Sequence, residues 1–288
     1  MSRPVDALLD YLRAEEAQGR ESVYLDEEAK ELLREFHRRA REKKTPVKKP
    51  AAAVAARMSS KEEPARTRVV EPVASISVSG DSAAEKIESL KQQAMNWAPA
   101  KALGTLRETM VFSTGNPEAE LMLVGEAPGY QEERQQQPFV GPAGQKLDGI
   151  LKAMGLDRGE VYISNIVKFR PSMPKQTTNN RKPTPEEMAS CMSFVREEVR
   201  IVKPKCIVAL GATAAEGLLG LTGAVGKMRG SWHEFEGIPT KVTYHPAYLL
   251  HGNAGLKDKR MIWEDMLAVM EKLELEISEK QRGFFLPK

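Results

Sequence analysis

The sequence has few cysteines, few aromatic residues and no long apolar run. Only Cys191 and Cys206 occur among 288 residues, too few for a disulfide framework or a four-cysteine metal site. No apolar stretch approaches the roughly 20 residues that span a bilayer, and the charged N-terminal stretch lacks a signal-peptide pattern. The composition, 41% hydrophobic and 29% charged, is typical of a soluble globular protein. We therefore predict a cytoplasmic protein that does not associate with membranes.

Charge is nearly balanced over the whole chain but not along it. The chain has 43 Lys and Arg against 40 Asp and Glu, a net charge of +3, whereas residues 30–68 hold 13 basic and 5 acidic residues, a surplus of +8. Residues 44–83 mix Lys, Pro, Ala and Ser without sustained periodicity, which predicts a flexible basic linker. The linker is either a solvated spacer or an arm that binds a polyanion by counterion release.

The pattern on either side of the linker indicates two different kinds of structure. Leucines at helical spacing within residues 1–43 predict N-terminal helices. Residues 84–288 alternate short apolar runs with amphipathic stretches, as α/β domains do. We expect strands at 120–124, 161–164, 205–210 and 241–244, and helices at 143–154, 185–202, 212–219 and 261–275. These elements suffice for an α/β fold with one sheet covered by helices on both faces.

Polar motifs follow several of the predicted strands, where ligands bind in such sheets. The turn GEAPG presents Glu126 on a tight bend, although phosphate binding or plain turn geometry would explain the turn equally well. Asn165 ends the next strand and offers both a donor and an acceptor, as recognition of uracil requires, but an asparagine can also cap a turn. His245 follows the last predicted strand. A carboxylate, an amide and an imidazole at one sheet edge together predict an active site.

The chain from about residue 107 to 268 resembles the family 4 uracil-DNA glycosylases. The blocks that carry the resemblance are GEAPG, PFVGPAGQKLDGIL, VYISNIVKFRP, NRKPTPEE, IVALGATAAEGLLG, GSWHEFEGI and HPAYLL. The resemblance implies a three-layer α/β/α fold with a central parallel sheet. It also implies a monofunctional enzyme that flips uracil out of DNA and hydrolyses its N-glycosidic bond, leaving an abasic site in base-excision repair. Uracil-containing DNA is then the partner, and we take action as a monomer as the default.

The resemblance implies a role for each of several pocket residues. Glu126 matches the acid that positions or activates water, and His245 matches the histidine beside uracil O2. Asn165 matches the amide that reads the base. Phe139 matches the aromatic that stacks on it, although the sequence alone allows a plain core position. Glu132 matches a residue associated with excluding a 5-methyl group.

Other residues are assigned to the pocket rim and to DNA. Ala127 shares the turn of the catalytic acid, and Asn180 matches an asparagine of the family, although the segment before it is longer than expected. Lys168 and Arg170 are candidates for contact with the DNA backbone, or else ordinary surface charges. His251 stands where the family more often has arginine, which weakens a phosphate contact at neutral pH.

The chain departs from the family at its iron–sulfur site. The family ordinarily holds a cluster with four cysteines, but residues 96–120 lack the expected pair, Phe169 occupies the third position, and only Cys191 matches a ligand. A four-cysteine cluster cannot be built from this sequence. We therefore predict no cofactor, with Phe169, Leu103 and Leu106 filling the space. We also predict no other metal site, because the histidines lack ligand spacing.

Three other functions remain as alternatives to a uracil-DNA glycosylase. A non-catalytic DNA-binding relative would have no need for the combined acid, amide and histidine. A glycosylase for another deaminated or damaged base would require only small pocket changes. An unrelated phosphate-binding enzyme is the least favoured, because the GEAPG turn lacks the lysine and hydroxyl of a P-loop.

Overall fold

The computed structural model describes residues 76–250 and 255–286. The predicted N-terminal helices, most of the predicted linker and His251 lie outside these residues. The folded part begins before the predicted boundary at residue 84, because Ile76 and Val78 already pack against the core. Helix α3 (Ala83–Met95) is capped by the preceding Ser82, whose hydroxyl accepts a hydrogen bond from the Glu85 N–H. Each helix in this part of the chain is too short or too polar to cross a membrane.

A six-stranded sheet forms the middle of the domain, in the order β2-β4-β3-β6-β8-β7. The four central strands are parallel and confirm the predicted ones: β3 (Leu121–Gly125), β4 (Tyr162–Asn165), β6 (Cys206–Leu210) and β8 (Ile238–Thr243). The edge strands β2 (Thr114–Gly115) and β7 (Trp232–Phe235) are antiparallel to their neighbours. They were not predicted, because neither has the continuous apolar run of a buried strand.

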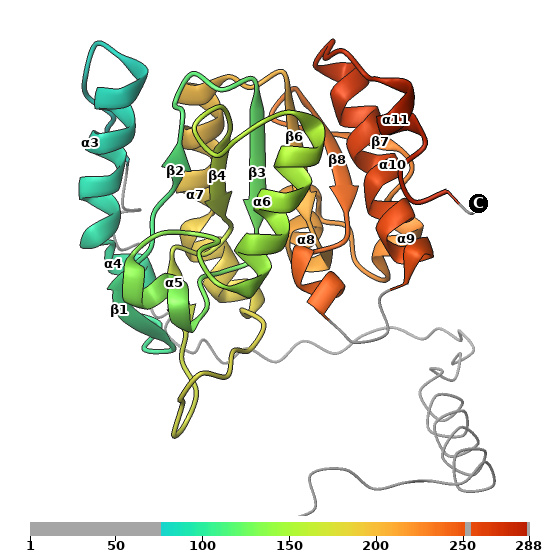
Figure 1. Ribbon diagram of the computed structural model, residues 1–288. Coiled ribbons are helices and arrows are strands. Elements are labelled where there is room, and N and C mark those ends of the chain that lie inside the picture. The colour runs from blue at the N-terminus through green and yellow to red at the C-terminus, as the bar shows by residue number, and fades with distance from the viewer. Residues whose placement is uncertain (1–75, 251–254, 287–288) are drawn as a thin grey trace, which may run out of the picture. The chain divides into compact units, whose positions relative to one another are not determined.

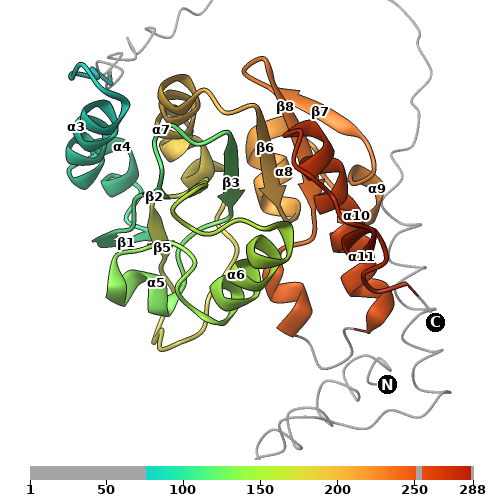
Figure 2. The ribbon, with the colours of Figure 1, turned by 45° about the horizontal axis from the view of Figure 1, so that its top comes forward.

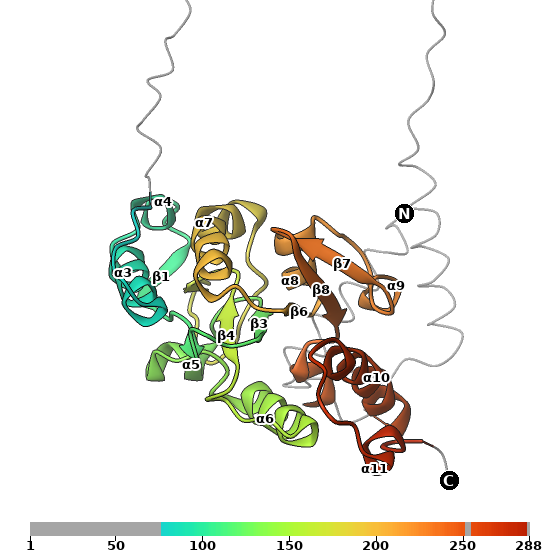
Figure 3. The same cartoon turned by 90° about the horizontal axis from the view of Figure 1, so that it is seen from above.

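Helices cover both faces of the sheet, and alternate strand residues decide which face each side chain meets. Met122 and Val124 point into a core shared with α7 (Pro185–Val202) and α8 (Ala212–Leu219). Leu121 and Leu123 point to the opposite face, which is covered by α6 (Pro142–Met154) and α10 (Leu256–Lys272). Figure 3 shows the sheet between these two helix layers. The predicted three-layer α/β/α fold is confirmed.

A small second sheet lies beside the main one. In it β1 (Leu106–Met110) pairs antiparallel with β5 (Phe169–Pro171), which follows β4 closely in the chain. Figure 2 shows this pair next to α5 (Tyr130–Gln135), the short helix that follows the turn after β3. The segment 172–184, yellow in Figure 1, then extends away from the sheet before α7 begins. Of these two additions, the 172–184 segment supplies residues to a cavity at the carboxyl ends of β3 and β4.

The remaining elements are short. They are α4 (Ala98–Lys101), α9 (Val225–Met228), the 3-10 helix η1 (Pro246–Leu250) and α11 (Glu279–Arg282). Of these, η1 follows β8 and contacts α6, so it also borders the carboxyl end of the sheet.

Candidate active site

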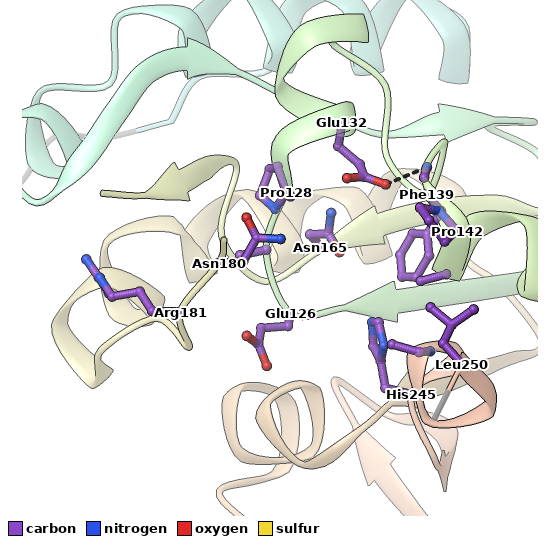
Figure 4. A pocket seen from close by; sticks show the side chains of 15 residues that line it. Glu126, Pro128, Glu132, Phe139, Pro142, Asn165, Asn180, Arg181, His245 and Leu250 are labelled. Atoms are coloured by element: carbon purple, nitrogen blue, oxygen red, sulfur yellow. Dashed lines mark hydrogen bonds between the residues drawn. The ribbon is translucent and has the colours of Figure 1, made fainter. Parts of the chain in front are cut away.

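A cavity of about 390 Å³ opens at the carboxyl ends of the parallel strands. Figure 4 shows side chains around it from the turn after β3, the end of β4, the segment before α7 and His245, which follows β8 by two residues. All the residues predicted for catalysis or base binding line the cavity: Glu126, Ala127, Glu132, Phe139, Asn165, Asn180 and His245. The structure therefore brings together the motifs that the sequence places at separate strand ends.

The close packing of this wall depends on Gly125, the last residue of β3. Gly125 is in register with Asn165 on β4. A Cβ atom on Gly125 would lie 2.4 Å from Asn165 Oδ1 and 2.5 Å from Phe139 Cζ. No side chain fits there without moving one of these two groups, so the first glycine of GEAPG is needed to let the amide and the ring approach each other.

Glu126 extends from the same turn and is half-buried. Burial raises the pKa of its carboxyl group, while a hydrogen bond from Thr213 and the charge of Lys182 act in the opposite direction. Desolvation makes a carboxylate a stronger base than it is in water. Glu126 is thus suited to hold and deprotonate a water molecule in the cavity.

The tautomer of His245 follows from a main-chain contact. The Ala247 N–H donates to His245 Nδ1 at 3.2 Å, so the proton of the neutral ring is on Nε2. Burial lowers the pKa of His245 from 6.5 to about 4, and the negative charge of Glu132 offsets only part of this effect. At neutral pH the ring is therefore uncharged and Nε2–H is available to donate a hydrogen bond.

Phe139 and Asn165 form a nearly dry part of the wall. They are 5% and 3% exposed, and the centroids of the Phe139 and His245 rings are 5.7 Å apart. The cavity thus has an aromatic face, an amide and an imidazole donor within a small space. A planar heterocycle with polar edges is the kind of ligand that these groups would bind.

Glu132 and Asn180 lie near the turn residue Gly129, and other groups fix their orientation. Glu132 Oε1 accepts from the Gly141 N–H at 2.8 Å. Asn180 Oδ1 accepts from Arg170 Nε at 3.0 Å, which leaves the Asn180 amide NH₂ free to donate. A Cβ on Gly129 would lie 2.7 Å from Glu132 Oε2 and 3.0 Å from Asn180 Nδ2. Despite the longer segment before it, Asn180 thus reaches the cavity.

The expectation that Lys168 and Arg170 contact DNA is wrong, because both side chains are buried. Lys168 is 0% and Arg170 1% exposed. Lys168 Nζ lies 2.6 Å from a Glu198 carboxylate oxygen and also donates to Asn165 O at 3.0 Å. Arg170 pairs with Glu133 at 2.9 Å and donates to two main-chain carbonyl oxygens as well as to Asn180. These cations form hydrogen bonds to the cavity residues Asn165 and Asn180 and are not available to phosphates.

Arg181 also lines the cavity and was not predicted from the sequence. It donates to both carboxylate oxygens of the buried Glu187, at 2.6 and 2.8 Å, and to the main chain of Ser172 and Thr105. It thereby attaches the 172–184 segment to the domain. An arginine in a polar loop gives no signal in the sequence that separates this role from that of a surface charge.

The cysteines do not fit an iron–sulfur cluster. Cys191 belongs to the core on the α7 face of the sheet, and Cys206 belongs to the core on the α6 face. Burial raises the pKa of both thiols, that of Cys206 to about 12, which opposes the thiolate form that binds metals. No group of three or more His, Cys, Asp or Glu residues that could hold a metal ion lies within residues 76–250 and 255–286.

Aromatic packing occupies the neighbourhood of Cys191. Trp97, Ala100 and Phe169 belong to the same core cluster as Cys191. The rings of Trp97 and Phe194 meet edge to face at 4.8 Å, and Trp97 Nε1 donates to Ser190 O at 2.6 Å. Of the residues predicted to fill this space, Phe169 is 1% exposed, Leu106 packs against the cluster, and Leu103 is half-buried.

Comparison with known proteins gives a consistent family assignment. The model of the uracil DNA glycosylase superfamily matches residues 112–267. The chain is 36% identical over 184 residues to a protein from Thermotoga maritima named type-4 uracil-DNA glycosylase. The aligned region covers 63% of this chain and 92% of that protein. A type-4 uracil-DNA glycosylase from Archaeoglobus fulgidus is 39% identical over 149 residues, 49% of this chain and 72% of its own. The chain thus belongs to the uracil DNA glycosylase superfamily, as a relative of the type-4 enzymes.

Proposed function

We propose that the protein is a uracil-DNA glycosylase that hydrolyses the bond between uracil and deoxyribose in DNA and leaves an abasic site for repair. The observation that carries the proposal is the convergence of Glu126, Phe139, Asn165 and His245 on one cavity. The cavity volume of about 390 Å³ is typical of small-ligand sites. Action as a monomer remains a prediction. The cytoplasmic location remains a prediction.

The cavity would bind the base after it has left the DNA stack. Flipping costs a few kcal/mol, and stacking on an aromatic ring such as Phe139 returns about 1–3 kcal/mol. The Asn165 amide pairs with the adjacent acceptor and donor of uracil, O4 and N3–H. Cytosine presents the reverse pattern, so its binding would leave buried polar groups unpaired at a cost of about 1–3 kcal/mol. Glu132, which accepts a hydrogen bond from the Gly141 N–H, would exclude the methyl group of thymine.

Cleavage builds negative charge on the departing uracil and positive charge on the sugar. His245 Nε2–H donates towards uracil O2, where negative charge develops, and it does so as a neutral ring because its pKa is about 4. The carboxylate of Glu126 favours the cationic sugar and holds a water molecule against C1′. The water oxygen bonds to C1′, its proton passes to Glu126, and the electron pair of the C1′–N1 bond leaves with uracil.

We also propose that this enzyme works without the iron–sulfur cluster of its relatives. Only two cysteines exist in the chain, and they lie in cores on opposite faces of the sheet. The aromatic packing of Trp97, Phe169 and Phe194 supplies cohesion where the cluster would otherwise link the chain segments. No step of the proposed reaction uses a metal.

The test is excision from oligonucleotides that differ in one base. Purified protein is incubated with matched strands that carry uracil, thymine or cytosine at a single position, in single- and double-stranded form, and abasic sites are cleaved with alkali. The proposal predicts cleavage only at uracil, with free uracil as the released product. Absence of cleavage by folded protein on both forms would refute it, and cleavage at another lesion would redirect it to that base.

A further inference from the structure

Phe139 adopts a backbone conformation that a bulky residue rarely adopts. Its φ is +54°, in the left-handed region. The side chain is 5% exposed and its ring lies against Gly125 and near His245. A conformation of this kind costs about 1 kcal/mol or more and persists only where the surroundings impose it. Contacts with the surrounding protein must therefore hold the Phe139 main chain in this conformation and its ring in the cavity wall.

The side chain of Arg158 donates hydrogen bonds to the main chain at Pro138 and Phe139. It lies between α6 and β4, outside the cavity lining. Its Nη1 donates to Phe139 O at 2.7 Å and its Nη2 donates to Pro138 O at 2.7 Å. Nη1 also pairs with Asp148 Oδ1 on α6 at 2.9 Å. One guanidinium thus fixes two successive carbonyl groups and connects them to a helix of the domain.

Gly144 in the first turn of α6 provides the space for this arrangement. A Cβ atom there would lie 1.7 Å from Phe139 O and 2.2 Å from its carbonyl carbon. Any side chain at position 144 would push the Phe139 main chain away. A Cβ atom on Gly149, in the same helix, would meet no atom of the described residues within 4 Å. A side chain at position 144 would therefore displace the Phe139 carbonyl group, whereas a side chain at position 149 would not.

We propose that Arg158 is a positioning residue that holds Phe139 in its stacking orientation before the base arrives. The inference deepens the proposed function, because it assumes that Phe139 stacks on flipped uracil. A preformed ring requires no ordering when the base enters, so its benefit falls on base binding. Loss of Arg158 should therefore raise KM and the inhibition constant of free uracil much more than it changes kcat.

The test compares four single variants with the wild-type protein on a uracil-containing oligonucleotide. Arg158→Met removes both carbonyl contacts, and Gly144→Ala displaces the carbonyl that they hold. Gly149→Ala is the matched control for the helix, and Asp148→Asn removes the ion pair while keeping the two carbonyl bonds. We expect the first two variants to raise KM and the uracil inhibition constant about tenfold, within the contribution of one base stacked on an aromatic ring. The two controls should stay within about twofold of wild type.

A double variant separates positioning from general stabilisation. If Arg158 acts through Phe139, then Phe139→Ala together with Arg158→Met should have the KM of Phe139→Ala alone. Thermal unfolding of each variant establishes that it is folded at the assay temperature. A wild-type KM in Arg158→Met, or effects that add in the double variant, would overturn the inference while leaving uracil excision intact. Absence of excision by the wild-type protein would instead refute the proposed function.

Discussion

The buried pair of Lys168 and Glu198 predicts a large loss of stability when one charge is removed. Both side chains are 0% exposed and their charged atoms are 2.6 Å apart. Glu198 also accepts from Tyr162 OH at 3.2 Å and from Ser164 Oγ at 2.9 Å. Lys168→Met leaves the Glu198 carboxylate buried without its cation. Breaking such a pair from one side typically costs about 3–5 kcal/mol.

That loss is large compared with the total stability of a domain, about 5–15 kcal/mol. For a domain of this size we expect the Tm of Lys168→Met to fall by roughly 10 °C. Combining it with Glu198→Gln removes both charges and keeps an acceptor for Tyr162 and Ser164. The double variant should therefore recover more than half of the lost free energy of unfolding, because no buried charge remains.

The assay is urea unfolding followed by circular dichroism, with an exposed ion pair as the control. Lys205 and Glu120 are 2.7 Å apart, but their side chains are 50% and 55% exposed. Lys205→Met should cost less than about 1 kcal/mol. If Lys168→Met cost no more than this control, or if the double variant lost the sum of its single variants, the reasoning about the buried pair would be refuted.

Further predictions concern ionisation, base binding and metal. Burial lowers the pKa of His245 from 6.5 to about 4, so the folded protein binds this proton less readily than the unfolded chain does. The stability that neutral His245 contributes is complete above about pH 6.5 and is lost as the pH falls towards 4. NMR titration of the ring should give a midpoint near pH 4, and a midpoint near pH 6.5 would contradict this expectation. Phe139→Ala should raise the inhibition constant of free uracil at least tenfold, for loss of about 1.4 kcal/mol or more of stacking, and an unchanged constant would remove Phe139 from the binding site. Treatment with an iron chelator should leave Tm and excision rate unchanged, whereas a loss of both with release of iron would contradict a cluster-free enzyme.

The sequence is sufficient to predict the central strands and three of the cavity residues for a physical reason, whereas Glu132, Phe139 and Asn180 follow only from the family resemblance. Buried parallel strands read as short apolar runs, and the carboxyl ends of such strands meet at one edge of the sheet. Glu126, Asn165 and His245 follow three such runs, so their convergence can be expected from the sequence alone. The edge strands β2 and β7 cannot be predicted in this way, because neither contains a continuous apolar run.

The sequence could not identify which charged residues are buried beside the cavity and hold its lining residues in position. Lys and Arg are rarely buried, so the sequence favours DNA contacts or surface charges for Lys168 and Arg170 even though apolar residues flank them. Their partners, Glu198 and Glu133, are 30 and 37 residues away. The role of Arg158 is hidden from the sequence for a different reason, because two of its contacts are main-chain carbonyls that carry no sequence signal. Pairings over such separations depend on the tertiary fold.

The most direct test of the account is the single-turnover rate of uracil excision by wild-type protein and by Glu126→Gln, in preparations whose iron content is measured. Gln keeps the size of the side chain but cannot accept a proton from water. The account predicts excision by iron-free wild-type protein and a rate lowered about 10²–10⁴-fold in the variant. An unchanged rate in Glu126→Gln, or excision that occurs only in iron-containing preparations, would contradict it.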